Sequence, residues 1–151
     1  MNSRPGPIIR KPDSGDIEAV TDLFIELDSD PYFHPHEMDR STAEAIAGYR
    51  GRDVYLVAWD GERAVAYGML RGWDEGFAVP ALGVAVVATA VGRGLGQAMM
   101  AALHREARRR GSTAVRLRVH PDNVRARRLY ALVGYREVGV ERGEIVMTLS
   151  L

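Results

Sequence analysis

The sequence predicts an α/β fold of the α+β type, with a mixed, mostly antiparallel central sheet of about seven strands flanked by about four helices. Strand-like and helix-like spacings of apolar residues alternate along the chain. A turn signal, Asp60-Gly61, between two apolar segments indicates an antiparallel hairpin. Farther on, a strand, an amphipathic helix and a second strand follow one another, which is the order of a parallel crossover. With 151 residues, of which 46% are hydrophobic, the chain is expected to fold as one domain over residues 1–151.

The first half of the chain is expected to contain three strands and two helices. Asp13 or Ser14 can cap the first helix, which follows a short apolar strand. Ser41 and Glu44 have the spacing of a capping box for a second, short helix that ends at one of the two following glycines. In order, these elements are expected at about residues 8–9, 17–27, 41–48, 54–59 and 64–70.

The second half is expected to contain the centre of the sheet. The unbroken apolar character of residues 77–87 predicts a central strand that is buried on both faces. In the strand after the next helix, apolar residues alternate with Arg116 and Arg118. Gly111 and Gly134 are the expected stops of the two helices in this half. The elements after the central strand are expected at about residues 94–110, 115–119, 124–133, 135–140 and 144–149.

The formal net charge is zero, but the charged residues are unevenly distributed. Residues 1–90 contain 8 basic and 15 acidic side chains, whereas residues 91–136 contain 11 arginines and only two acidic residues. A local basic excess in a neutral protein favours a site for a phosphorylated ligand over general attraction to nucleic acid. All basic residues but one are arginine, a bias that phosphate binding and genome composition explain equally well. The absence of cysteine excludes disulfides, thiolate nucleophiles and cysteine zinc sites.

The most informative local motif is a glycine-rich segment between the central strand and the helix after it. Three glycines alternate with other residues in Val91-Gly92-Arg93-Gly94-Leu95-Gly96. Glycines at this spacing let the main chain approach a ligand, and the helix N-terminus adds about half a positive charge, so the segment suits an anion. It lacks the lysine of a P-loop and the glycine spacing of a dinucleotide-binding loop. A turn that only connects strand and helix explains the loop, taken alone, equally well.

A second motif follows about 30 residues later, and the two motifs together establish a resemblance. Its residues fall at fixed spacing: Asn123, Ala126, Leu129, Tyr130, Gly134 and Tyr135. The pair resembles the two blocks of GCN5-related N-acetyltransferases (GNAT), Arg/Gln-x-x-Gly-x-Gly/Ala and Asn-x-x-Ala-x-x-Leu-Tyr-x-x-x-Gly-Phe/Tyr. The resemblance implies the GNAT fold, in which strands four and five are parallel and splayed. Two positions depart from the family pattern, since Val91 stands where the family has Arg or Gln, and Ala88 where it often has proline.

The resemblance also implies roles for individual residues. Main-chain groups of Val84 and Val86 would pair with the pantetheine arm of acetyl-coenzyme A, and an amide there would polarise the thioester carbonyl. Asn123 would bond to the pantetheine, although a pure helix cap explains it equally well. Tyr130 would protonate the leaving thiolate rather than serve only as a packed tyrosine. The Arg93 side chain could replace the contact that is missing at Val91. The pyrophosphate would be bound by the residues of the glycine loop: Gly92, Arg93, Gly94, Leu95, Gly96 and Gln97.

The general base is not evident, because residues 77–86 contain no titratable side chain. Candidates lie in loops that flank the acceptor cleft in relatives: His34, His36, Glu37, Asp74 and Glu75. Histidine has the most suitable ordinary pKa, about 6.5, although both histidines can also be plain loop residues. The acceptor pocket is expected to use aromatic and histidine side chains: Phe33, His34, His36 and Trp73. No metal is expected, because no third ligand accompanies the two histidines.

The sequence thus predicts an enzyme that moves an acetyl group from acetyl-coenzyme A to a primary amine by direct attack in a ternary complex. Transfer of another acyl group, a hydroxyl acceptor and a non-catalytic acyl-coenzyme A-binding protein are the alternatives. The acidic residues 1–90 favour a cationic acceptor, either a small molecule or a peptide. No nucleic-acid or membrane partner is expected, because no groove-reading motif, export signal or spanning segment is apparent, and the cytoplasm is the expected location. Relatives alone suggest a homodimer through the C-terminal strands.

Overall fold

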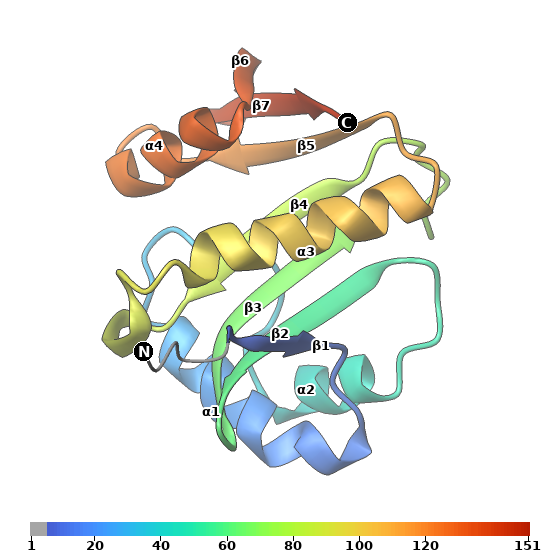
Figure 1. Ribbon diagram of the computed structural model, residues 1–151, viewed down its shortest axis with the longest axis vertical. Coiled ribbons are helices and arrows are strands. Elements are labelled where there is room, and N and C mark those ends of the chain that lie inside the picture. Colours follow the sequence, from blue (N-terminus) through green and yellow to red (C-terminus); the bar gives the residue numbers. More distant parts are fainter. Residues whose placement is uncertain (1–5) are drawn as a thin grey trace, which may run out of the picture.

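The computed structural model describes residues 6–151, which form a seven-stranded sheet with helices on both faces (Figure 1). The strands are β1 (Ile8–Arg10), β2 (Val54–Asp60), β3 (Arg63–Arg71), β4 (Ala81–Val86), β5 (Ala114–Val119), β6 (Arg136–Glu141) and β7 (Glu144–Ser150). The helices are α1 (Ile17–Leu27), α2 (Arg40–Ala47), α3 (Leu95–Arg109) and α4 (Val124–Val133), with short 3-10 turns η1 (Ser14–Asp16) and η2 (Ala88–Ala90). The strand order is β1-β2-β3-β4-β5-β7-β6, and only β4 and β5 run parallel. The predicted mixed sheet is therefore confirmed, with β4 at its centre.

The sheet is divided between β4 and β5. β4 is in register with β3 along its whole length, and β5 is in register with β7 along its whole length. Between β4 and β5 themselves, Ala81 and Arg116 are the only registered pair in the described part of the chain. The Arg116 N–H also donates to the Pro80 carbonyl at 3.0 Å. The two strands therefore meet near their N-terminal ends and separate beyond them, which is the predicted splay.

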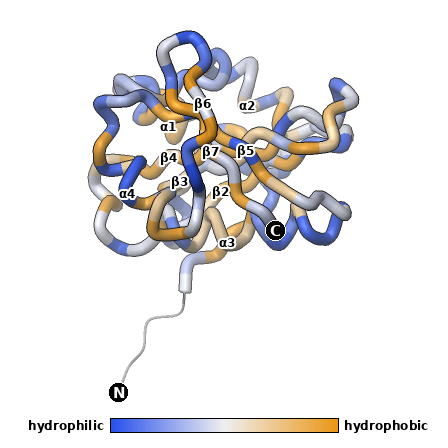
Figure 2. Tube along the Cα trace, turned by 90° about the horizontal axis from the view of Figure 1, so that it is seen from above, coloured by the Kyte–Doolittle hydropathy of each residue, from blue (hydrophilic) through white to orange (hydrophobic). Residues whose placement is uncertain are grey.

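Side-chain alternation along β3 assigns one helix layer to each face of the sheet. Tyr67 points toward α1, where its ring lies 5.0 Å from that of Phe24 between centroids. The next residue, Gly68, lies so close to α3 that a Cβ there would be 2.6 Å from Met99. Helices α1 and α2 therefore cover one face and α3 covers the other, as Figure 1 shows. Figure 2 shows hydrophobic colouring along much of the packed strands and hydrophilic colouring at the peripheral turns.

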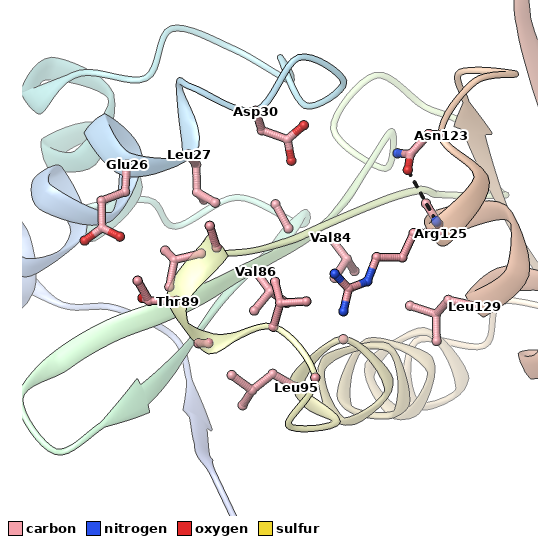
Figure 3. Close-up of a pocket in the computed structure, with 18 of the residues that line it drawn as sticks. Glu26, Leu27, Asp30, Val84, Val86, Thr89, Leu95, Asn123, Arg125 and Leu129 are labelled. Carbon is pink, nitrogen blue, oxygen red and sulfur yellow. Dashed lines mark hydrogen bonds between the residues drawn. The ribbon is translucent and has the colours of Figure 1, made fainter.

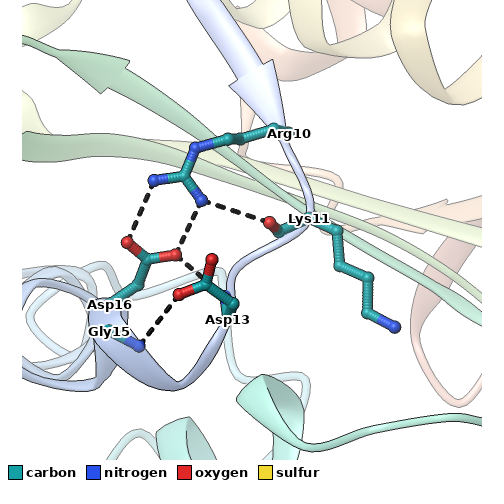
Figure 4. A network of polar contacts seen from close by, with 5 residues as sticks. All are labelled: Arg10, Lys11, Asp13, Gly15 and Asp16. Atoms are coloured by element: carbon teal, nitrogen blue, oxygen red, sulfur yellow. Dashed lines mark hydrogen bonds and ion pairs between the residues drawn. The ribbon is translucent and has the colours of Figure 1, made fainter.

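A polar network fixes the connection from β1 to α1 (Figure 4). The Asp13 side chain accepts from the Gly15 N–H at 2.9 Å, and the Asp16 side chain accepts from the Asp13 N–H at 2.8 Å. Arg10 donates both terminal nitrogens to the Asp16 carboxylate, at 2.7 and 3.0 Å, which lowers the pKa of Asp16. The Arg10 guanidinium also lies 4.6 Å over the Trp59 ring. Asp13, one of the two predicted caps, thus starts the first helical segment while Arg10 ties it to the sheet.

The predicted N-cap of α2, Ser41, is wrong by two residues. Asp39 is the N-cap, because its side chain accepts from the Thr42 N–H at 2.9 Å. The helix therefore begins before Ser41, and the Ser41–Glu44 capping box does not form. Aspartate and serine have nearly equal N-cap propensities, so propensity alone could not decide which of Asp39 and Ser41 caps the helix. The helix ends at Ala47 with Gly48 as its C-cap, so the first of the two glycines predicted as its end is the one used.

Two strand boundaries also differ from the prediction. Residues 77–80 form a loop before β4, in which Phe77 is 61% exposed. Pro80 ends that loop because it has no N–H to give to a neighbouring strand. In the hairpin, Asp60 pairs with Arg63 and belongs to β2, so the turn lies one residue later than predicted. The remaining strands agree with the sequence to within one or two residues.

The amphipathic helix α3 (Leu95–Arg109) is one residue shorter at each end than predicted, and the predicted glycine stop is present. It ends at Arg109, and Gly111 follows with a left-handed φ of +80°. Its last turn contains Arg108 and Arg109, whose charges oppose the helix dipole. None of the helices in residues 6–151 is long and apolar enough to cross a membrane.

We expect Gly68→Ala to destabilise the protein by about 1–3 kcal/mol, because the added methyl group would overlap the buried Met99 side chain. Gly139→Ala is the matched control, since nothing lies within 4 Å of a Cβ built there. Urea unfolding followed by circular dichroism measures both variants. Equal stability of the two would contradict the close contact between β3 and α3.

Candidate active site

A cavity of about 720 Å³ lies where β4 separates from β5 (Figure 3). This volume falls in the range of roughly 300–1,000 Å³ that is typical of ligand sites. Its walls are the end of α1 with the loop after it, β4, residues 87–97 and the first two turns of α4. Most of the predicted cofactor-binding residues line it, together with the predicted catalytic residue: Val84, Val86, Gly92, Gly94, Leu95, Gly96, Gln97, Asn123 and Tyr130. The structure thus brings the two sequence motifs together around one space.

The three glycines of the loop meet two different structural demands. Gly92 and Gly94 have φ values of +87° and +77°, in the left-handed region that a Cβ disfavours. Gly96 lies in the first turn of α3, where a Cβ would be 3.2 Å from the Leu129 side chain of α4. The first two glycines therefore shape the loop, and the third lets α3 and α4 approach each other.

The N-terminus of α3 lies at the cavity without a side-chain cap. Gly94 is the N-cap residue, and its carbonyl accepts from the Ala98 N–H at 3.0 Å. The N–H groups of residues 95–97 precede this bond and so have no partner within the helix. Together with the helix dipole they provide about half a positive charge. This set of donors fits a phosphate or pyrophosphate group.

The arginine that accompanies these amides is Arg125 rather than Arg93. Arg93 donates to the Asp60 carboxylate beside the β2–β3 turn at 3.3 Å, and it does not line the cavity. Within the described residues, Arg125 is the one arginine that does line it, and Figure 3 shows its guanidinium extending from α4 toward β4. The expectation that the Arg93 side chain replaces the contact missing at Val91 is therefore corrected. Asp60 binds that side chain instead.

Hydrogen bonds at the two ends of β4 determine which of its main-chain groups face β5. The Val87 N–H donates to the Val65 carbonyl of β3 at 3.0 Å, whereas the Pro80 carbonyl accepts from β5. Because main-chain groups alternate sides along a strand, those of Val84 and Val86 point toward β5. β5 is not in register with them, and both residues line the cavity. Their N–H and C=O groups can therefore bond to an extended ligand as another strand would.

Tyr130 lines the same cavity from α4 and is only 8% exposed. Burial, with a smaller effect of the negative charge of Asp30, raises the pKa of Tyr130 to about 12. The hydroxyl is therefore protonated at neutral pH and can give its proton to a developing anion. Tyr135 differs, because its hydroxyl is bonded to Nε2 of the buried His104 at 2.7 Å.

Asn123 combines the two roles that the sequence left open. Its side-chain oxygen accepts from the Ala126 N–H at 3.3 Å, so it caps α4. The same residue lines the cavity, and Figure 3 shows its side chain near the start of α4. The cap uses only the oxygen, which leaves the NH₂ group of the side chain to donate to a ligand.

The predicted acceptor residues of the α1–α2 loop do not line this cavity. The Phe33 ring lies edge-on to the Tyr67 ring at 6.2 Å, on the α1 face of the sheet, and His34 is exposed. His36 is bonded through Nδ1 to the Glu37 carbonyl and through Nε2 to the Tyr67 hydroxyl, both at 2.8 Å. A neutral imidazole that donates at Nδ1 and accepts at Nε2 satisfies both bonds, and burial lowers the pKa of His36. Neither ring nitrogen is left to take a proton from an acceptor.

Trp73 lies at the other end of α3 from the cavity. It is buried, and Arg110 lies 5.2 Å over its ring. The neighbouring Asp74 accepts a hydrogen bond from the Tyr49 hydroxyl. The structure therefore separates Trp73, Asp74 and the exposed Glu75 from the cavity, where they had been candidates for the pocket wall and the base. These contacts hold the β3–β4 loop instead.

Three charged residues at the cavity were not predicted from the sequence. Arg125 could have been found, because it lies one helical turn before the motif residue Leu129. Asp30 lies in the α1–α2 loop, and Glu26 lies in the last turn of α1 before it. No local pattern in the sequence indicates that this loop reaches the cavity. Within residues 6–151, no three His, Asp or Glu side chains come together as a potential metal site.

Comparison with known proteins assigns residues 20–135, which include both motifs, to the acetyltransferase (GNAT) family. No curated protein sequence gave a match. Among solved structures, a GCN5-related N-acetyltransferase from Kribbella flavida is 21% identical with a TM-score of 0.80, covering 96% of this chain and 98% of that chain. PaiA N-acetyltransferase from Thermoplasma acidophilum, in complex with coenzyme A, is 13% identical with a TM-score of 0.80, covering 97% and 100%. YncA, a putative acetyltransferase from Salmonella typhimurium with its cofactor acetyl-CoA, is 22% identical with a TM-score of 0.73, covering 97% and 95%. These likenesses show that the fold is shared.

The lowered pKa of His36 predicts a pH dependence of stability. The unfolded state binds more protons than the folded state below the ordinary histidine pKa, so the free energy of unfolding should decrease as pH falls through about 6.5. His36→Gln should flatten this decrease, because glutamine does not titrate and can still accept from Tyr67. Urea unfolding at a series of pH values measures the profile. The exposed His34→Gln serves as the control, and identical profiles for the two variants would contradict the assignment.

Proposed function

The chain belongs to the acetyltransferase (GNAT) family, and from this premise we propose that it transfers an acetyl group from acetyl-coenzyme A to a primary amine by direct attack. The observation that carries the proposal is the presence of two main-chain sites in one cavity. They are the uncapped N-terminus of α3 and the edge of β4 that β5 does not pair. The first suits a pyrophosphate, and the second suits an extended chain with amide groups. Coenzyme A has these two parts in succession, with the thioester at the far end.

The residues that would bind this carrier differ in chemical type. The amides of residues 95–97 would bind the pyrophosphate oxygens, and Arg125 would add a full positive charge beside them. The main-chain groups of Val84 and Val86 would bond to the amides of the pantetheine arm. The NH₂ group of Asn123 would donate to the same arm. All of these groups are contributed by β4 and by the two helix N-termini that border the gap.

Bound acetyl-coenzyme A supplies an activated acyl carbon and a thiolate leaving group. An unpaired amide of β4 would stabilise the negative charge that develops on the carbonyl oxygen. As the amine nitrogen bonds to the acyl carbon and the C–S bond breaks, Tyr130 would give its proton to the sulfur. The attacking neutral amine in turn gives up one proton, which returns through water to the Tyr130 oxygen. Direct attack is consistent with a chain that has no cysteine to carry an acyl group.

The amine acceptor is supported by the acidic balance of residues 1–90 and by the carboxylate of Asp30, which lines the cavity. The cytoplasmic location, the homodimer and the absence of nucleic-acid and membrane partners stay predictions from the sequence. None of them enters the chemistry above.

Calorimetric titration with acetyl-coenzyme A, followed by mass spectrometry of products from a panel of amines, tests the proposal. We expect binding and an acetylated amine. Arg125→Ala should weaken binding about tenfold, because a charge-assisted contact to phosphate is lost. Arg128→Ala, an exposed arginine on α4 outside the cavity, is the matched control. Absence of binding would overturn the proposal, and modification of hydroxyl groups alone would replace the amine as acceptor.

Tyr130→Phe should lower kcat about 100-fold while the Kd for acetyl-coenzyme A stays within about twofold, because only the proton donor is removed. Tyr135→Phe removes a hydroxyl of the same kind that is bonded to His104, so it should affect stability and leave kcat unchanged. Steady-state thiol release and calorimetry give the two constants. An unchanged kcat in Tyr130→Phe would remove this residue from the mechanism.

A further inference from the structure

We infer that the carboxylate of Asp30 binds the ammonium group of the acceptor and makes the site specific for amines that are cationic before they react. This inference rests on the proposed function, because it assigns the subsite of the second substrate in the same cavity. The acceptor class is an alkylamine, carried by a small molecule or by a peptide. Uncharged arylamines and hydroxyl compounds fall outside this class.

Asp30 lies in the loop that follows α1, across the cavity from α4. It is half-buried and lines the same cavity as Tyr130. Figure 3 shows its side chain extending from the loop toward the space between β4 and α4. Its negative charge contributes to the raised pKa of Tyr130. Because Asp30 and Tyr130 line one cavity, a cation held by Asp30 would share that space with the Tyr130 hydroxyl.

The charge of Asp30 is available to a ligand, whereas that of the other carboxylate at the cavity is not. Both oxygens of Glu26 accept from Arg63 at 2.9 Å, and Arg63 also donates to Thr89 at 3.3 Å. Within residues 6–151, no arginine, lysine or histidine forms an ion pair with Asp30. Glu26 is thus already paired with a cation of the chain itself. Asp30 is the carboxylate that can attract a cation from solution.

The loop holds Asp30 in a fixed place. The Asp30 N–H donates to the Leu27 carbonyl at 2.9 Å, and its Oδ1 accepts from the Tyr32 N–H at 2.9 Å. The Tyr32 ring lies 5.2 Å from the His120 ring, which follows the end of β5. The loop therefore spans from α1 to the strand on the far side of the gap. Because Oδ1 serves the turn, Oδ2 is the oxygen that would face the acceptor.

A carboxylate at this place acts as an anchor rather than as a strong base. A carboxylate is a far weaker base than an alkylamine, so it accepts hydrogen bonds from the ammonium group without taking its proton. The ammonium first loses one proton to water, and the neutral nitrogen then bonds to the acyl carbon. As the C–S bond breaks, the sulfur takes the Tyr130 proton, and the second amine proton returns to Tyr130 through water. One proton is released for each amide formed.

The experiment uses two synthetic ligands that share the carrier and differ in charge. S-(2-aminoethyl)-coenzyme A places an ammonium group close to where the acceptor nitrogen attacks, and S-propyl-coenzyme A is its neutral counterpart. Calorimetry gives the ratio of their Kd values for each protein, together with the Kd for coenzyme A itself. In the unchanged protein the ammonium ligand should bind about tenfold more tightly than the propyl ligand, as expected for a hydrogen bond between charged groups.

Asp30→Asn should abolish this preference and leave coenzyme A binding unchanged. The variant keeps the loop, because an asparagine oxygen can accept from the Tyr32 N–H as the carboxylate does. Asp28→Asn, two residues earlier and outside the cavity, should keep the full preference. Equal binding of the two ligands by the unchanged protein, or a preference that persists in Asp30→Asn, would overturn the inference while coenzyme A binding upheld the carrier site. Failure of coenzyme A itself to bind would overturn the proposed function.

Discussion

The cavity depends on the early end of the hydrogen-bond ladder between β4 and β5. Each strand keeps a full partner on its outer edge, β3 for one and β7 for the other, so the sheet holds together where the inner edges separate. A main-chain group that is shielded from both water and a partner costs about 1–3 kcal/mol. The unpaired main-chain groups of β4 avoid this free-energy cost only because water or a ligand can bond to them. Val84 and Val86 are accordingly half-buried, whereas Leu82 and Ala85, on opposite faces of β4, are buried as predicted for a central strand.

The contact between α3 and α4 places the rest of the site along that edge. Gly96 sets how closely the two helices approach, because any side chain there would press on Leu129. α4 carries Asn123, Arg125 and Tyr130 within two turns of that contact, so one packing interaction positions a hydrogen-bond donor, a cation and an acid. A shift of α4 away from α3 would move all three groups together. The glycine therefore has a structural role in binding even though it offers the ligand only an amide.

Much of the fold could be predicted because its signals are local in the sequence. Glycine stops, alternating strands and two motifs at fixed spacing located the elements and the residues around the α3–α4 contact. The α1–α2 loop could not be placed this way, because contacts far apart in the sequence decide its path. His36 is drawn into the core by Tyr67, and Tyr32 crosses to His120, which brings Asp30 to the cavity. Residue types in that loop suggested an acceptor site, but only the packing shows which of them reach the cavity.

The zero net charge of the chain conceals a polarity across the cavity. The arginine-rich part of the sequence supplies Arg125 on one wall, beside the uncapped end of α3, and the acidic part supplies Asp30 on another. Fields of opposite sign in one low-dielectric space attract ligands of opposite charge to different places. An anionic acyl carrier and a cationic acceptor would each be repelled from the place that the other occupies. The separation of the two charges would thus align the reacting groups before any bond forms. Such alignment of two bound reactants supplies much of the rate enhancement of an enzyme.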